Sequence, residues 1–167
     1  NADGATNTSH SELSNVVNFT SGSDAVNSDD TPHDDHGHGT HVAGIIAADK
    51  GDGGMHGVAY DATLYAFKVL NDSGSSVGNS VASGMDKARA AEVDIINLSL
   101  GSDTQIGTTC DSASTCETAI GSTGYTAREA LGAAGIIQVW AAGNSANAQP
   151  SIDGGSAIYD DDFKETT

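Results

Sequence analysis

Apolar and polar positions along the chain predict three strands. Partial alternation, with β-branched and aromatic side chains, runs through Thr63–Leu70. Similar runs occupy Val93–Leu100 and Gly135–Ala142. Short apolar runs bounded by Gly, Asp and Ser are typical of strands. We therefore expect a strand in each of these three segments.

Helical spacing fills the intervals between the strands. Asn79–Ala91 places Val81 and Met85 on one face, as an amphipathic helix would. Thr126–Ala134 is the second helical segment. A short buried helix is expected over Gly39–Asp49, where small residues allow close packing.

The order strand, helix, strand, helix, strand predicts an α/β fold. We expect three layers, α/β/α, with a mostly parallel central sheet that is incomplete in this chain. Residues 1–35 and 101–123 are expected to be loops. Sites in such sheets lie at the carboxyl ends of the strands. Chemistry is therefore expected after Leu70, around Ser99–Gly101 and around Gly143.

The net charge of the chain limits the kinds of molecule that it could bind. The 167 residues hold 6 Lys and Arg against 23 Asp and Glu, a net charge of −17. Nucleic-acid binding needs a basic patch, so we exclude it. No apolar run reaches the roughly 18 residues of a membrane helix, and no signal-peptide pattern occurs. The acidity suits either a stable secreted surface or a high-salt environment in which counterions screen the repulsion.

Two cysteines, Cys110 and Cys116, lie close together among loop-type residues. A disulfide between them would close a small ring and would indicate export. The alternative is a pair of free thiols in a cytosolic protein.

The segment His33–His41 is the densest group of titratable residues. On spacing alone, three interpretations stay open. His36, His38 and His41 could bind a metal ion, they could be solvated loop residues, or one of them could be a general base at a helix N-terminus. Glycine at position 39 would let a substrate or a strand come close to such a ring.

Gly74–Gly78 fits the Gly-x-Ser-x-Gly pattern, which would make Ser76 a nucleophile. In that fold the serine follows its strand directly and the histidine comes last in the chain. Here Asn71–Gly74 intervenes, and every histidine precedes Ser76. We therefore reject this interpretation.

Four motifs together resemble the subtilisin-like serine proteases, the subtilases. His38-Gly-Thr-His-Val-Ala-Gly44 resembles their histidine motif, and the stretch Gly57–Leu70 resembles the segment that follows it. Asp94–Gly101 resembles the substrate-binding strand, and Trp140-Ala-Ala-Gly-Asn144 resembles the oxyanion-hole motif. The motifs occur in the family's order and span most of the chain.

The resemblance implies roles for particular residues. His38 would be the general base, and the side-chain amide of Asn144 would stabilise the oxyanion. Asp3 would orient His38, although Asp3-Gly-Ala departs from the family's Asp-[Ser/Thr]-Gly. The residues that would line the substrate cleft are Ser99, Leu100 and Gly101 on one side and Gly74, Ser75 and Ser76 on the other.

The family's Gly-Thr-Ser motif has no match after Asn144. We therefore expect residues 1–167 to be a partial subtilase catalytic domain whose nucleophilic serine lies outside this segment, and we expect it to be poorly stable in isolation. Two rival functions stay open: a peptide-binding protein without catalysis, either a pseudoenzyme or a truncated product, and a His-rich metal-binding domain.

The resemblance also implies a secreted monomer that acts on protein or peptide substrates. No cofactor is expected for catalysis. Structural calcium is common in the family, and Glu12 and the Asp49–Asp52 loop are the acidic candidates for such a site.

Overall fold

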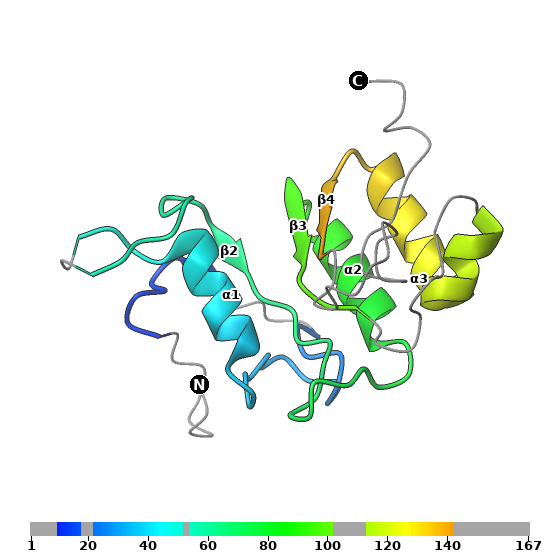
Figure 1. The fold of residues 1–167 in the computed structure, drawn as a ribbon, viewed down its shortest axis with the longest axis horizontal. Coiled ribbons are helices and arrows are strands. Elements are labelled where there is room, and N and C mark those ends of the chain that lie inside the picture. Colours follow the sequence, from blue (N-terminus) through cyan, green and yellow to red (C-terminus); the bar gives the residue numbers. More distant parts are fainter. Residues whose placement is uncertain (1–9, 18–21, 52–53, 102–112, 142–167) are drawn as a thin grey trace, which may run out of the picture. The chain divides into compact units, whose positions relative to one another are not determined.

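The computed structural model describes residues 10–17, 22–51, 54–101 and 113–141, without the side chains of Val17 and of 113–120. Along these residues the order of elements is β1–α1–β2–α2–β3–α3–β4 (Figure 1). The chain divides into one unit over Asn1–Ala88 and a second over Arg89–Thr167. Each unit has its own pair of parallel strands.

Helix α1 (His38–Ala47) confirms the short helix expected from the sequence, but not its burial, because Ala47 is its only buried residue and Ile45 is 58% exposed. It ends at Ala47 because Ala48, with φ −58° and ψ 140°, leaves the helical region. The N–H groups of residues 57–59 donate hydrogen bonds of 2.8–3.1 Å to the carbonyl oxygens of Ile45, Ile46 and Ala48. Carbonyl groups that a helix leaves open at its C-terminus are thus satisfied by a later loop.

The strands of the first unit are short. β1 (Val16–Val17) pairs in parallel with β2 (Leu64–Tyr65). The rest of the predicted strand Thr63–Leu70 makes isolated bridges, at Lys68 and at Leu70. The prediction placed the segment correctly but gave it too long a continuous strand.

Asn15, just before β1, joins three stretches of backbone. Its Nδ2 donates hydrogen bonds to the carbonyl oxygens of Ala47, Tyr60 and Ala62, at 3.2, 3.3 and 2.7 Å. Its own carbonyl oxygen accepts a hydrogen bond of 3.1 Å from the N–H of Leu64. One side chain therefore ties the end of α1 to the loop that leads into β2.

Helix α2 (Ser80–Ala90) confirms the amphipathic pattern, with Met85 almost completely buried. A Cβ on Gly84 would overlap Cγ1 of Val69, so the helix lies directly on the segment before it. The hydroxyl of Ser80, which is also buried, donates a hydrogen bond of 2.6 Å to the carbonyl oxygen of Val69.

In the second unit, β3 (Ile95–Leu98) pairs in parallel with β4 (Ile137–Trp140). Helix α3 (Ala113–Ala133) connects them, with a kink at Gly121, where φ is 76°. The sequence interpretation assigned 101–123 to loop, and this was wrong from Ala113 onward. The core of this unit contains Leu98, Ala127, Leu131 and Ile136, all buried.

Strand–helix–strand order with parallel pairing confirms the predicted α/β class. Within the described residues, no helix combines the length and the apolar character that crossing a lipid bilayer requires.

Candidate active site

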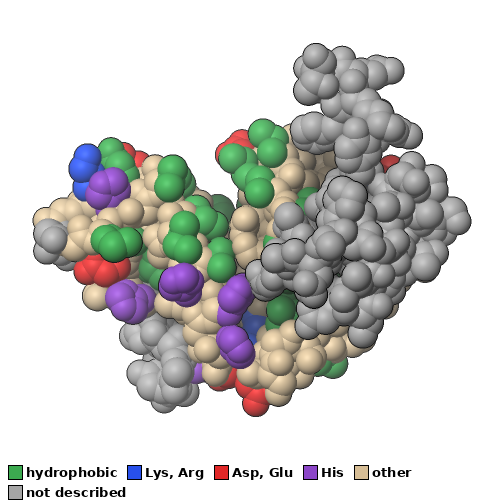
Figure 2. All heavy atoms as spheres, in the orientation of Figure 1, with side chains coloured by type: hydrophobic (Ala, Val, Ile, Leu, Met, Phe, Trp, Pro, Cys, Tyr) green, Lys and Arg blue, Asp and Glu red, His purple; other side chains and the backbone are tan. Residues whose placement is uncertain are grey.

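His38 is the first residue of α1, and its side chain is exposed. Gly37, immediately before it, has φ 93° and ψ −15°, a left-handed conformation that glycine adopts without a steric penalty. The rings of His36 and His38 meet edge to face, with their centroids 6.3 Å apart. Histidine side chains reach the surface in Figure 2. An imidazole in this position is accessible to a reactant.

The carboxylate of Asp34 caps the start of α1. Its Oδ1 accepts hydrogen bonds from the N–H groups of His36 (3.1 Å) and Gly37 (2.7 Å). Its Oδ2 accepts one from the N–H of Thr40 (2.7 Å) and one from the Thr40 hydroxyl (2.6 Å). The N-cap residue Gly37 has no side chain to do this. Asp34 therefore supplies the acceptor that a helix N-terminus needs.

These contacts decide the ionisation of Asp34. Burial by itself would raise the pKa of this carboxyl group. The hydrogen bonds from the side chain and backbone of Thr40 and from the N–H groups of Gly37 and His36 outweigh burial, and the pKa lies well below its usual value. Asp34 is therefore a carboxylate at neutral and mildly acidic pH.

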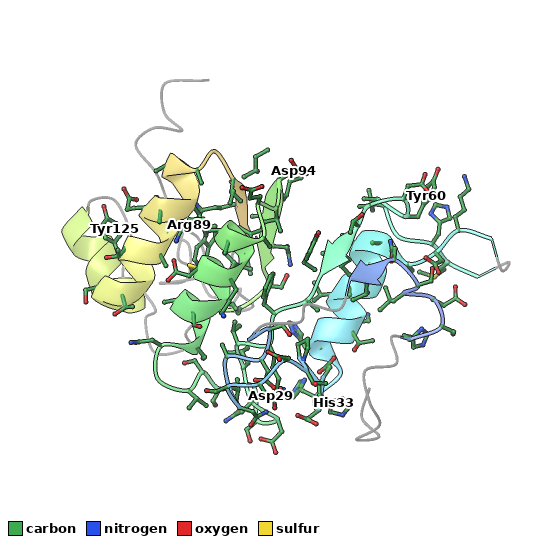
Figure 3. The ribbon with its side chains drawn as sticks, turned by 180° about the vertical axis from the view of Figure 1, so that it is seen from behind. Asp29, His33, Tyr60, Arg89, Asp94 and Tyr125 are labelled. Carbon is green, nitrogen blue, oxygen red and sulfur yellow. The ribbon has the colours of Figure 1, made fainter. Side chains whose placement is uncertain are left out.

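The neighbouring Asp35 connects this segment to the rest of the first unit. Its Oδ2 lies 3.3 Å from Nζ of Lys68, whose side chain is 8% exposed. Its Oδ1 lies 3.5 Å from Nε2 of His33. Figure 3 labels His33 near the end of α1 that carries His38. The chain that leads into the helix is thus tied down at two successive carboxylates.

The structure describes the whole segment 33–41, and this bears on the metal-site interpretation. Neither there nor elsewhere in the described ranges do three His, Cys, Asp or Glu side chains form a group that could hold a metal ion. A metal site at His36, His38 and His41 has no geometric support.

Gly74, Ser75 and Ser76 lie in a tight exposed turn after Leu70. The Oδ1 of Asn71 accepts hydrogen bonds from the N–H groups of Ser73 (3.0 Å) and Ser75 (2.9 Å). Gly74 has φ 72°, and Ser76 forms an antiparallel bridge with Leu70. Ser76 therefore does not occupy a sharp strand-to-helix turn, which agrees with its rejection as a nucleophile.

Ser99, Leu100 and Gly101 directly follow β3 in the second unit. The N–H of Ala141, just past the end of β4, donates a hydrogen bond of 3.2 Å to the carbonyl oxygen of Leu98. Because the strands are parallel, residues 99–101 and Ala141 follow their strands at the same edge of the sheet. That is the carboxyl edge, where α/β sheets carry their sites.

The comparison with protein families decides the classification. The model of the subtilase family matches residues 2–162. The chain belongs to the subtilase family.

Individual subtilases and a solved structure agree with this. The chain is 42% identical over 124 residues to a thermostable alkaline protease of Halalkalibacterium halodurans, covering 74% of this chain and 30% of that protein. It is 38% identical over 141 residues to subtilisin DY of Bacillus licheniformis, covering 82% and 43%. The structure of sphericase matches with a TM-score of 0.67 and 35% identity, covering 89% and 46%. The chain thus spans less than half the length of each.

Several residues expected to be functional lie outside the described residues. These are Asp3, Asn144 and Cys110; Cys116 lies in the described backbone of α3, but its side chain is not described. Their predicted roles, including the disulfide, stay predictions.

The structure describes part of the acidic segments that the family resemblance suggests for calcium. The N–H of Asp49 donates to the carbonyl oxygen of Glu12 (2.8 Å), and Oδ2 of Asp49 accepts from the N–H of Ser14 (3.2 Å). These contacts bring the two acidic segments together. In the described part of both segments no metal-holding group of side chains occurs, and Asp52 lies outside it. Calcium binding therefore stays a prediction.

The sequence interpretation missed Asp34. No capping motif marks this position, because Asp34 lies three residues before the N-cap residue Gly37. Asp34 was hidden in a run of acidic residues that looked uniformly solvated.

Proposed function

We propose that this subtilase is a serine endopeptidase that hydrolyses peptide bonds of proteins. The observation that carries the proposal is the exposed His38 at the first residue of α1, on a backbone fixed by Asp34, in a chain of this family. A general base must be accessible to the reacting group and held in place. The nucleophilic serine lies outside residues 1–167, which form a partial catalytic domain.

The proposed chemistry is acyl transfer. The serine hydroxyl attacks the carbonyl carbon of the scissile peptide bond while Nε2 of His38 takes its proton. The carbonyl oxygen becomes an oxyanion, to which the side-chain amide of Asn144 donates a hydrogen bond. His38 then protonates the leaving amine, the C–N bond breaks, and water hydrolyses the acyl-enzyme by the same steps. Asp3 orients His38 throughout, and no cofactor takes part.

The substrate would bind as an extended strand. Residues 99–101 leave β3 at the carboxyl edge of the sheet, and their backbone offers the donors and acceptors that an added strand needs. Gly74, Ser75 and Ser76 would also contact the substrate, and their turn is exposed. The small side chains leave the backbone accessible.

The proposal includes secretion as a monomer with a disulfide between Cys110 and Cys116. The related alkaline protease and subtilisin DY support the protease class. The acidic surface suits an extracellular protein that must stay soluble.

The test is made in the full-length protein, with His38→Ala and His36→Ala as matched variants. We expect wild type to hydrolyse casein and to be labelled by a fluorophosphonate, His38→Ala to lose activity by several orders of magnitude, and His36→Ala to retain most of it. Full activity of His38→Ala would refute the assignment. Tight peptide binding without any hydrolysis or labelling in wild type would favour the peptide-binding alternative.

A further inference from the structure

We propose that Asp34 is a positioning residue for His38: its carboxylate fixes the backbone on both sides of the histidine and thereby sets the direction of the imidazole. This inference rests on the function proposed above, because the position of His38 matters to a rate only if His38 is the general base.

The hydrogen bonds of Asp34 surround His38 in the sequence. Two go to the residues before it, His36 and Gly37, and two go to Thr40 after it. All are 2.6–3.1 Å long, and both carboxylate oxygens take part. The Cα of His38 therefore lies in a segment whose ends are held by a single rigid group.

The local backbone needs this support. The first N–H groups of a helix have no partner within the helix, and first turns fray unless they are capped. Gly37 is in the left-handed conformation and has no Cβ, so it restricts its own backbone little and cannot cap. A carboxylate at this end also interacts favourably with the helix dipole.

Because the pKa of Asp34 is lowered, its carboxyl group stays ionised at neutral and mildly acidic pH, and these hydrogen bonds are kept. A protonated carboxyl group would lose acceptor strength toward the N–H groups of His36, Gly37 and Thr40. Asp35 cannot substitute, because its oxygens are engaged by Lys68 and His33.

The expected consequence is a loss in kcat with little change in KM. A misplacement of about 1 Å at a reacting group can lower the rate by about 10²-fold. For Asp34→Asn we expect kcat to fall by about 10- to 100-fold. The amide retains one oxygen, but its NH₂ group would face the N–H of Thr40. KM should stay within about twofold, because the hydrogen bonds of Asp34 go to residues 36–40 and leave the substrate-contacting segments unchanged.

Thr40 provides a gentler pair of variants. Thr40→Val removes the hydroxyl that donates to Oδ2 and retains the shape, whereas Thr40→Ser retains the hydroxyl. We expect kcat to fall in Thr40→Val and to stay close to the wild-type value in Thr40→Ser. This pair keeps the inference testable if Asp34→Asn does not fold.

Asp24 is the matched control. Its carboxylate is almost fully buried and accepts hydrogen bonds from the N–H groups of Val26 and Asn27 (both 2.8 Å) and from Nδ2 of Asn27 (2.9 Å). It thus holds a turn as Asp34 does, away from His38 in the sequence. Asp24→Asn should lower the Tm without changing kcat per active site. Asp29→Asn, which loosens the exposed turn at Thr31, replaces it if folding fails.

The experiment uses the full-length protein and titrates active sites with a fluorophosphonate, so that unfolded molecules are not counted. kcat and KM are measured with a peptide p-nitroanilide, and Tm by calorimetry. A kcat loss in Asp34→Asn and Thr40→Val, absent in Thr40→Ser and Asp24→Asn, supports the inference. Wild-type kcat per titrated site in Asp34→Asn, with only Tm lowered, overturns the inference alone. A wild-type protein that neither hydrolyses the peptide nor reacts with the fluorophosphonate overturns the proposed function and this inference with it.

Discussion

Gly57 lies directly against the backbone of Ala47, at the last turn of α1. A Cβ on Gly57 would overlap the amide nitrogens of Ala47 and Ala48, and these belong to the main chain rather than to a flexible side chain. The same contact brings the N–H of Gly57 within 2.9 Å of the carbonyl oxygen of Ala48. The close approach and the hydrogen bond depend on each other.

Gly57→Ala should therefore destabilise the protein by about 1–3 kcal/mol, as overpacking a tight contact does. The measurement is urea unfolding of the full-length protein with an active-site inhibitor present. Gly54→Ala is the matched control, because a Cβ there meets no atom within 4 Å among the described residues. Equal unfolding midpoints for the two variants would contradict the prediction.

Ser80→Ala should lower the free energy of unfolding by about 1–3 kcal/mol, because it removes a buried hydroxyl and leaves a partly buried acceptor without its donor. The Ser80 hydroxyl donates to the carbonyl oxygen of Val69 (2.6 Å) and accepts from the N–H of Val77 (3.1 Å). Calorimetry would detect the change as a lowered Tm. Ser73→Ala, at an exposed hydroxyl, should change stability by less than about 0.5 kcal/mol.

Asn15→Asp should destabilise more than Asn15→Ala at neutral pH. The alanine variant loses the hydrogen bonds to the carbonyl oxygens of Ala47, Tyr60 and Ala62, while the aspartate variant directs a negative charge at them. Chemical unfolding at pH 7 would give this order. A stability of Asn15→Asp equal to that of wild type would show that the amide donors contribute nothing.

The lowered pKa of Asp34 predicts a pH dependence of stability. Its folded-state pKa lies below the unfolded value of about 3.9, so the contribution is fully present above that value and is lost as pH falls through it toward the folded pKa. The free energy of unfolding should therefore fall more steeply with acidification below about pH 5 in wild type than in Asp34→Asn. Parallel curves for the two proteins would rule out this linkage.

The sequence predicted secondary structure well where apolar residues recur with the period of a strand or a helix. The strand at Val93–Leu100 and the helix at Asn79–Ala91 were predicted within a few residues of β3 and α2. The expected loop over 101–123 was wrong from Ala113 onward, because Ser, Thr and Gly have weak helix propensity and Gly121 interrupts the spacing. β1, with two residues, is too short to produce a pattern.

For the candidate site too, the sequence pointed to one residue and missed another. His38 was singled out by its motif, and its role as the general base stays a prediction. Asp34 could not be separated from the acidic residues around it, because its partners are the backbone N–H groups of His36, Gly37 and Thr40, which every residue except proline also has. Only the folded chain shows which carboxylate receives them.

Helix α1 is held at both ends by groups outside it: the carboxylate of Asp34 at the start and the N–H groups of residues 57–59 at the end. Fraying normally begins at an uncapped terminus, and here neither terminus is uncapped. Amide hydrogen exchange in α1 should then require opening of the whole first unit. On heating, hydrolytic activity and tertiary structure should disappear over the same temperature interval, with no earlier inactivation from a loosened histidine.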